Sequence, residues 1–140
     1  LNILGWSYGG YAALQSTILS PGLYKHVVAI APVTDLEMLK IEDRFWMDGR
    51  ESAERIGSGA HIVEGSPARR AEEITAPVLM FHGTHDGNVG VDQARIMHKR
   101  LQAEGKSSEL VVFPELDHSL VDSEARAEML RRIGDFLKAD

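Results

Sequence analysis

A serine stands between two glycines near the start of the chain, in Gly5-Trp6-Ser7-Tyr8-Gly9. A short apolar run precedes this segment, and small residues with a helical pattern follow it. A Gly-x-Ser-x-Gly pattern between a strand and a helix is typical of a sharp, strained turn that exposes the serine hydroxyl above a sheet, with glycines beside it to avoid clashes. We therefore predict that Ser7 is a nucleophile in acyl transfer. The backbone N–H of Tyr8, at a helix start, is expected to stabilise a developing oxyanion.

A serine nucleophile needs a base to accept its proton and an acid to orient that base. On a parallel α/β sheet, functional side chains collect in the loops that follow the strands. Asp86 comes four residues after an apolar run that ends at His82, and His118 lies between the last predicted strand and the last predicted helix. The chain order Ser7, Asp86, His118 is the order of nucleophile, acid and base in the α/β-hydrolase fold. These three residues are our predicted catalytic residues.

The other candidates for base and acid fit less well by position. His26 begins a predicted strand, at the wrong end of the sheet, while His61 lies in a glycine-rich segment and His98 on a polar stripe of a predicted helix. Asp117 is the competing acid, but neighbours in sequence rarely point at each other, which favours Asp86 over Asp117 as the partner of His118.

A metal site is the alternative interpretation of the histidines around Asp86. His82, His85 and Asp86 lie within five residues of one another. Their spacing matches no common ligand pattern, and a serine nucleophile needs no metal. We expect neither a metal nor another cofactor.

Composition limits the class of protein and its partners. The 140 residues are 44% hydrophobic and 26% charged, which is typical of one globular domain, and no apolar run approaches the roughly 18 residues of a membrane span. The net charge of −6, without a cluster of basic residues, argues against nucleic acid and anionic membrane as partners. The absence of cysteine excludes disulfides and a cysteine nucleophile, and it leaves the compartment open. A small peptide or ester substrate is expected instead.

Apolar runs of strand length alternate with helical patterns along the chain. Strands are predicted before Ser7 and at residues 26–31, 78–82 and 109–113, and helices at residues 8–19, 35–46, 68–74, 91–101 and from Asp122 or Ser123 onward. This alternation predicts an α/β fold with about four parallel strands and flanking helices on both faces. Residues 49–65, with four glycines, give no clear pattern.

Apolar residues at helical spacing indicate which sides of two helices face the core. In the helix expected at 35–46 the apolar anchors are Leu36, Leu39, Phe45 and Trp46. In the last helix the inward residues are expected to be Met129, Leu130, Ile133, Phe136 and Leu137.

The chain begins inside a predicted core strand, with neither an initiating methionine nor a signal or transit peptide. Natural domains avoid an unpaired strand of this kind, because it exposes a hydrogen-bonding edge. We therefore expect residues 1–140 to be the C-terminal part of a larger hydrolase domain. The exposed edge at Leu1–Leu4 is expected to pair with a second copy.

Five segments resemble the C-terminal catalytic domain of the prolyl oligopeptidase (S9) family of serine peptidases, and are most similar to its dipeptidyl-peptidase and acylaminoacyl-peptidase branches. The resemblance covers nearly the whole chain. The segments are Gly5–Tyr11, Ala31–Asp35, Ser66-Pro67, Ala76-Pro77 and His82–Val89.

The resemblance implies a role for each matching position. Ser7 would attack the scissile carbonyl, His118 would take and return the proton, and Asp86 would orient His118. Tyr8 would offer its backbone N–H to the oxyanion. Asn88 would hydrogen-bond the substrate backbone.

The resemblance also implies a pocket for the residue before the cleaved bond, lined by the ring of Tyr8 with Val33 and Val89. The family supplies further aromatic residues from the segment after Ala-Pro-Val. This chain has Leu36 and Leu39 there instead, so the family's preference for proline is not carried over.

In the family, a second oxyanion donor and a β-propeller precede the segment that this chain resembles, so the chain alone is expected to be weakly active or inactive. Two other interpretations stay open. One is a carboxylesterase or dienelactone-hydrolase-like enzyme acting on small esters. The other is a non-catalytic piece whose sheet edge serves in self-association.

Overall fold

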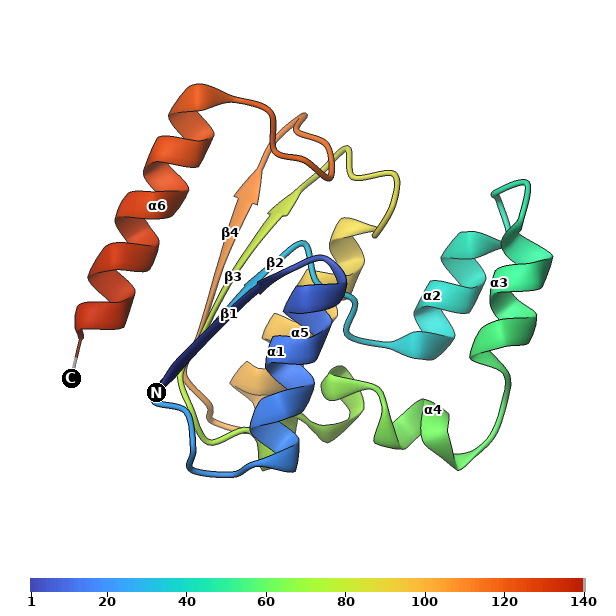
Figure 1. Cartoon of the computed structure of the whole chain (residues 1–140), viewed down its shortest axis with the longest axis horizontal. Coiled ribbons are helices and arrows are strands. Elements are labelled where there is room, and N and C mark those ends of the chain that lie inside the picture. The colour runs from blue at the N-terminus through green and yellow to red at the C-terminus, as the bar shows by residue number, and fades with distance from the viewer. Residues whose placement is uncertain (140) are drawn as a thin grey trace.

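A four-stranded parallel sheet forms the centre of the computed structural model, which describes residues 1–139 (Figure 1). The strands are Asn2–Trp6 (β1), His26–Ile30 (β2), Val78–Gly83 (β3) and Ser108–Phe113 (β4). They lie in the order β1-β2-β3-β4, and each pairs in parallel with the next. Because all four strands point the same way, their carboxyl ends meet at one edge of the sheet. The predicted α/β fold is confirmed.

Helices cover both faces of this sheet. They are Tyr8–Leu19 (α1), Leu36–Asp43 (α2), Gly49–Ile56 (α3), Ala60–Glu64 (α4), the 3₁₀ segment Pro67–Glu73 (η1), Val91–Ala103 (α5) and Ser123–Lys138 (α6). Figure 1 shows α1 and α5 on one side of the sheet and α6 on the other. The helices α2, α3 and α4 lie beyond α1, away from the strands. None of the helices formed by residues 1–139 combines the length and the apolar character of a membrane span.

The core consists of two apolar layers separated by the sheet. Every residue of β2 and of β3 is buried, as expected for parallel strands with helices on both faces. Alternate residues point to opposite layers, so that Val27 and Met80 pack against Leu14 and Met97 in the first layer. The second layer joins β2 and β3 to α6 and includes Val28, Ile30, Leu79, Phe81, Met129 and Ile133. The two central strands therefore form a rigid support for the loops that follow them.

Polar side chains define the start of two helices that flank the site. The Asp35 carboxylate accepts hydrogen bonds from the backbone N–H groups of Glu37 and Met38 and so caps α2. Asp122 accepts from the N–H of Ala125 and caps α6. Such caps satisfy backbone donors that have no partner within the helix. The expected start of the last helix is confirmed, with Asp122 as the cap.

The structure corrects two predictions about helices, one for the helix expected at 35–46 and one for the last helix. The second helix ends at Asp43, and Phe45 and Trp46 are 89% and 54% exposed, so they do not anchor it. Leu130 is 66% exposed, because a helix turns about 100° per residue and its neighbour Met129 occupies the core face. Residues 49–65, which gave no pattern, contain the two short helices α3 and α4.

Candidate active site

The turn between β1 and α1 holds Ser7 in a strained conformation. Ser7 has a φ of 59°, which non-glycine residues rarely adopt. Its N–H donates to the carbonyl of Ile30 at 2.8 Å, and its own carbonyl accepts from the N–H of Tyr11 at 3.1 Å. The turn is therefore fixed both to β2 and to α1, and the predicted strained corner is confirmed.

The two glycines beside Ser7 differ in what they make possible. A Cβ added to Gly5 would lie 1.9 Å from the carbonyl oxygen of Gly9. A Cβ added to Gly9 would meet nothing within 4 Å. Only the first glycine is sterically required, so the expectation that both flanking residues must lack a side chain is half wrong.

Replacing Gly5 by alanine is expected to destabilise the fold by about 3 kcal/mol, because backbone atoms of α1 would have to move and overpacking of this kind is costly. The matched control is Gly9→Ala, which is expected to leave stability unchanged or to raise it by up to about 1 kcal/mol through helix propensity. Chemical denaturation of both variants measures the difference. Equal midpoints for the two would contradict the proposed role of Gly5.

His118 links Ser7 to Asp86. Its Nε2 accepts from the Ser7 hydroxyl with 2.9 Å between the heavy atoms, and its Nδ1 donates to Asp86 Oδ2 at 2.7 Å. The three residues come from the turn after β1, the loop after β3 and the loop after β4. The structure thus brings the three predicted residues together. The carboxylate of Asp117 accepts instead from the N–H of Ser119, at 3.0 Å.

Hydrogen-bond donors surround the carboxylate of Asp86, which is fully buried. Its Oδ1 accepts from the N–H groups of Asn88 and Val89 at 2.9 and 2.8 Å. Burial raises the pKa of this carboxyl, but the hydrogen bonds from His82, Val89, His118 and Asn88 outweigh that effect and hold the pKa below its usual value of 3.8. Asp86 is therefore an anion at neutral pH, and its charge can stabilise a protonated His118.

Two further residues hold the loop that carries His118. The indole N–H of Trp6 donates to the His118 carbonyl at 3.2 Å. The guanidinium of Arg126, on α6, donates to the carbonyls of Leu120 and Ser119 at 3.0 and 2.9 Å. Sequence reasoning missed both residues. Trp6 lies inside the serine motif and could have been noticed there, whereas Arg126 carries no sequence signal of its role.

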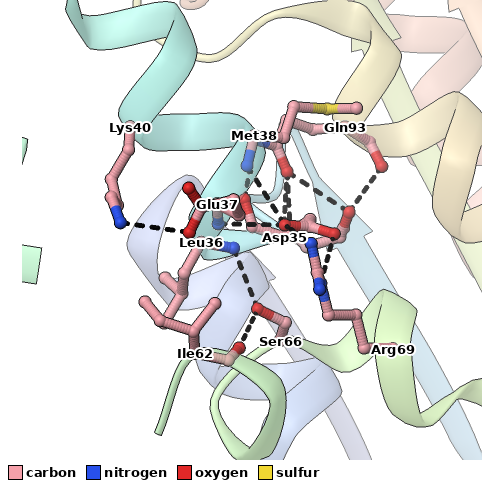
Figure 2. A network of polar contacts seen from close by, with 10 residues as sticks. Asp35, Leu36, Glu37, Met38, Lys40, Ile62, Ser66, Arg69 and Gln93 are labelled. Atoms are coloured by element: carbon pink, nitrogen blue, oxygen red, sulfur yellow. Dashed lines mark hydrogen bonds and ion pairs between the residues drawn. The ribbon is translucent and has the colours of Figure 1, made fainter. Parts of the chain in front are cut away.

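A buried polar network fixes the loop after β2, as Figure 2 shows. Gln93 of α5 is fully buried, and its side-chain oxygen accepts from the N–H groups of Thr34 and Asp35, each at 2.9 Å. Its amide nitrogen donates to the carbonyl of Asp35 at 3.2 Å. Arg69 of η1 donates to the Asp35 carboxylate at 2.9 Å. This network attaches the loop that carries Val33 to α5, whose first residue comes shortly after Asp86.

The residues predicted to contact the substrate follow the carboxyl ends of strands, with Tyr8 at the start of α1 and Val33, Asn88 and Val89 in loops. Tyr8 is 78% exposed. Because Tyr8 is the first residue of α1, its backbone N–H has no partner inside the helix. Val33 is half-buried and Asn88 is exposed. Val89 is only 5% exposed, so most of its side chain packs inside the protein.

A small hollow lies next to Asn88, with a volume of about 220 Å³. It is lined by Asp43, Trp46, Gly87 and Asn88. The indole of Trp46 lies 3.6 Å from the position that a Cβ on Gly87 would take. Trp46, which lies between α2 and α3, therefore borders the loop that carries Asp86.

The remaining histidines, other than His82, have partners away from the Ser7–His118–Asp86 group or are exposed. His26 contacts the Asn2 side chain, His61 the Ile56 carbonyl and His98 the Ser108 hydroxyl, and His85 is exposed. Within residues 1–139, no three side chains of the metal-binding types are grouped so as to hold a metal ion.

The sheet is parallel and has helices on both faces. A serine lies at a strained turn, and a histidine and an aspartate come from later loops. Together these features define an α/β-hydrolase fold. The model of the prolyl oligopeptidase family matches residues 1–140. The chain belongs to this family, peptidase family S9, whose members are serine peptidases.

Individual relatives and solved structures agree with this assignment. Bovine dipeptidyl peptidase 4 is 27% identical over 137 residues, which are 97% of this chain and 18% of the bovine protein. The crystal structure of Porphyromonas gingivalis dipeptidyl peptidase 4 is 25% identical, with a TM-score of 0.81 over 97% of this chain and 19% of that one. Pyrococcus horikoshii acylaminoacyl peptidase has the same fold, with a TM-score of 0.85 at 20% identity over 98% of this chain and 23% of that one. The chain thus spans less than one fifth of the bovine relative.

Proposed function

We propose that this chain carries the catalytic residues of a serine peptidase that cleaves short oligopeptides through an acyl-enzyme on Ser7. The observation that supports this most directly is the hydrogen-bonded series from Ser7 through His118 to Asp86, at a strained turn in a member of a peptidase family. Dipeptidyl peptidases and acylaminoacyl peptidases among the relatives support a peptide substrate.

The first half of the reaction forms the acyl-enzyme. Ser7 Oγ attacks the scissile carbonyl carbon while its proton passes to His118 Nε2, and the Asp86 carboxylate stabilises the imidazolium that results. The N–H of Tyr8 donates to the oxyanion of the tetrahedral intermediate. When this intermediate collapses, the C–N bond breaks and the leaving amine takes the proton from His118.

The second half releases the acyl group. A water molecule gives a proton to His118 Nε2 and attacks the ester carbonyl, again with the Tyr8 N–H on the oxyanion. The bond to Ser7 Oγ then breaks, and Ser7 recovers its proton from His118. Asn88 and the ring of Tyr8, both exposed beside this centre, are proposed to bind the substrate backbone and the residue before the cleaved bond, with Val33 and Val89 behind them.

The test uses the full-length protein with a fluorophosphonate probe, aminoacyl and dipeptidyl arylamides, and short acyl esters. We expect the probe to label Ser7 and the arylamides to be hydrolysed. Hydrolysis of the esters alone would identify an esterase and would contradict the peptidase proposal. Failure of the probe to label Ser7 in the folded protein would exclude both forms of catalysis.

A further inference from the structure

A second histidine lies beside the acid of the site. His82, near the end of β3, is fully buried. Its Nε2 lies 2.8 Å from the carbonyl oxygen of Val89 and 3.3 Å from Asp86 Oδ2. A carbonyl oxygen only accepts hydrogen bonds, so Nε2 must carry a hydrogen, which it donates to Val89 with Asp86 Oδ2 close beside it.

The other nitrogen of the His82 ring has no such contact. Within residues 1–139, Nδ1 of His82 is buried without a hydrogen-bond partner. In a neutral imidazole with its hydrogen on Nε2, Nδ1 is a bare acceptor. A buried acceptor without a partner lowers stability. The polar contacts of the ring are therefore confined to its Nε2 side, where Asp86 lies.

We propose that His82 is a positioning residue for the proposed peptidase reaction: its single N–H closes the Asp86–Val89 loop and shares Asp86 Oδ2 with His118. This inference rests on the proposed function. Nothing in the roles described above for Ser7, His118 and Asp86 requires a second histidine.

The contacts around Asp86 explain how His82 would act. Oδ2 faces two ring N–H groups, that of His118 at 2.7 Å and that of His82 at 3.3 Å, and the two backbone donors on Oδ1 prevent the carboxylate from rotating. Each donor withdraws negative charge from the oxygen it contacts. With the His82 donor removed, Oδ2 becomes a stronger acceptor, and its hydrogen bond with the ring N–H of His118 becomes shorter and stronger.

Two other titratable groups lie beside this loop: Asp43, which borders the hollow next to Asn88, and Glu42. The carboxylate of Glu42, on α2, accepts from the N–H of Gly90, the residue directly after Val89, at 3.3 Å. Burial raises the pKa of Glu42. A Glu42→Gln variant keeps the acceptor and removes the charge, so it separates any effect of Glu42 on the pH profile from that of His82.

The experiment compares His82→Leu, which removes the N–H, with His82→Gln, whose amide nitrogen reaches the position of Nε2. The full-length protein is used. His98→Leu is the matched control, because the ring of His98 also makes a hydrogen bond, in this case to the Ser108 hydroxyl at 2.7 Å and away from Asp86. The readouts are the pH profile of kcat/KM and the NMR signal of the proton between His118 and Asp86. The second readout does not require catalysis.

For His82→Leu we expect kcat to fall by about 10- to 100-fold with little change in KM, which is the cost of small misplacements in an active site. The acid limb of the profile should move to higher pH, and the proton signal should move downfield. His82→Gln should recover most of each change. His98→Leu and Glu42→Gln should leave the position of the acid limb within experimental error.

An unchanged pH profile and proton signal in folded His82→Leu would overturn the proposal, as would equal defects in His82→Leu and His82→Gln. If His82→Leu does not fold, His82→Asn replaces it, since that amide is too short to reach Asp86 and the same shifts are expected. A wild-type protein that the fluorophosphonate does not label at Ser7 would refute the proposed function. The NMR signal would still decide whether His82 acts on Asp86.

Discussion

Replacing Ser7 by alanine is expected to lower kcat by about 10⁴- to 10⁶-fold, the range seen when the nucleophile of a Ser-His-Asp group is removed. Without the hydroxyl no acyl-enzyme forms, and His118 has no proton to accept from the protein. Stability should change little, because alanine meets the same backbone restriction at a φ of 59° as serine does. Steady-state hydrolysis of a dipeptidyl arylamide measures the loss, and fluorophosphonate labelling should disappear with it.

Ser16→Ala is the control for Ser7→Ala, since Ser16 lies in the second half of α1, nine residues after Ser7. Its activity should stay within about twofold of the wild type, because Ser16, although half-buried, lies away from the turn that holds Ser7. Residual activity above about one percent in Ser7→Ala, with labelling retained at another serine, would show that Ser7 is not the nucleophile.

The positions of Ser7, Asp86 and His118 could be predicted because each follows a strand. In a parallel sheet all such loops meet at one edge, so a strand count along the sequence is enough to bring distant residues into one region. The strain at Ser7 was predictable for a similar reason, because a tight turn from a strand into a helix has few allowed conformations. In each case a local pattern together with one topological rule was sufficient.

Gln93 could not be predicted in this way. It lies on α5, where a polar residue is ordinarily expected to face solvent, yet it is fully buried. The cause is tertiary, because the backbone N–H groups of Thr34 and Asp35, 58 or more positions earlier in the chain, need an acceptor inside the protein. No local pattern shows which helix will supply that acceptor.

Exposed apolar residues are a second class that sequence patterns misassign. Phe45 and Trp46 were expected to anchor a helix because they are large and apolar, but both are exposed between α2 and α3, and these two helices lie beyond α1, away from the strands. Hydrophobic spacing indicates which residues share a face of a helix. It does not indicate whether another layer covers that face.

Asp86→Asn is expected to lower kcat by about 10⁴-fold with a smaller change in KM. Every group around the carboxylate of Asp86 is a donor, namely the rings of His118 and His82 and two backbone N–H groups. An amide NH₂ at this position finds an acceptor only if His118 moves its hydrogen from Nδ1 to Nε2. In that tautomer Nε2 can no longer accept the proton of Ser7, so the hydroxyl is not activated.

The matched control is Asp117→Asn, since Asp117 precedes His118 but its carboxylate accepts from the N–H of Ser119. Its kcat should stay within about threefold of the wild type, as for other exposed positions. A large loss in Asp117→Asn with activity retained in Asp86→Asn would reverse the assignment of the acid.

Stability provides a second measurement of the role of Asp86, because the pKa of Asp86 in the folded protein lies below the usual 3.8. The wild type should therefore be more stable than Asp86→Asn at neutral pH. This advantage in stability should disappear as the pH falls below 3.8 and through the lower pKa that Asp86 has in the folded protein.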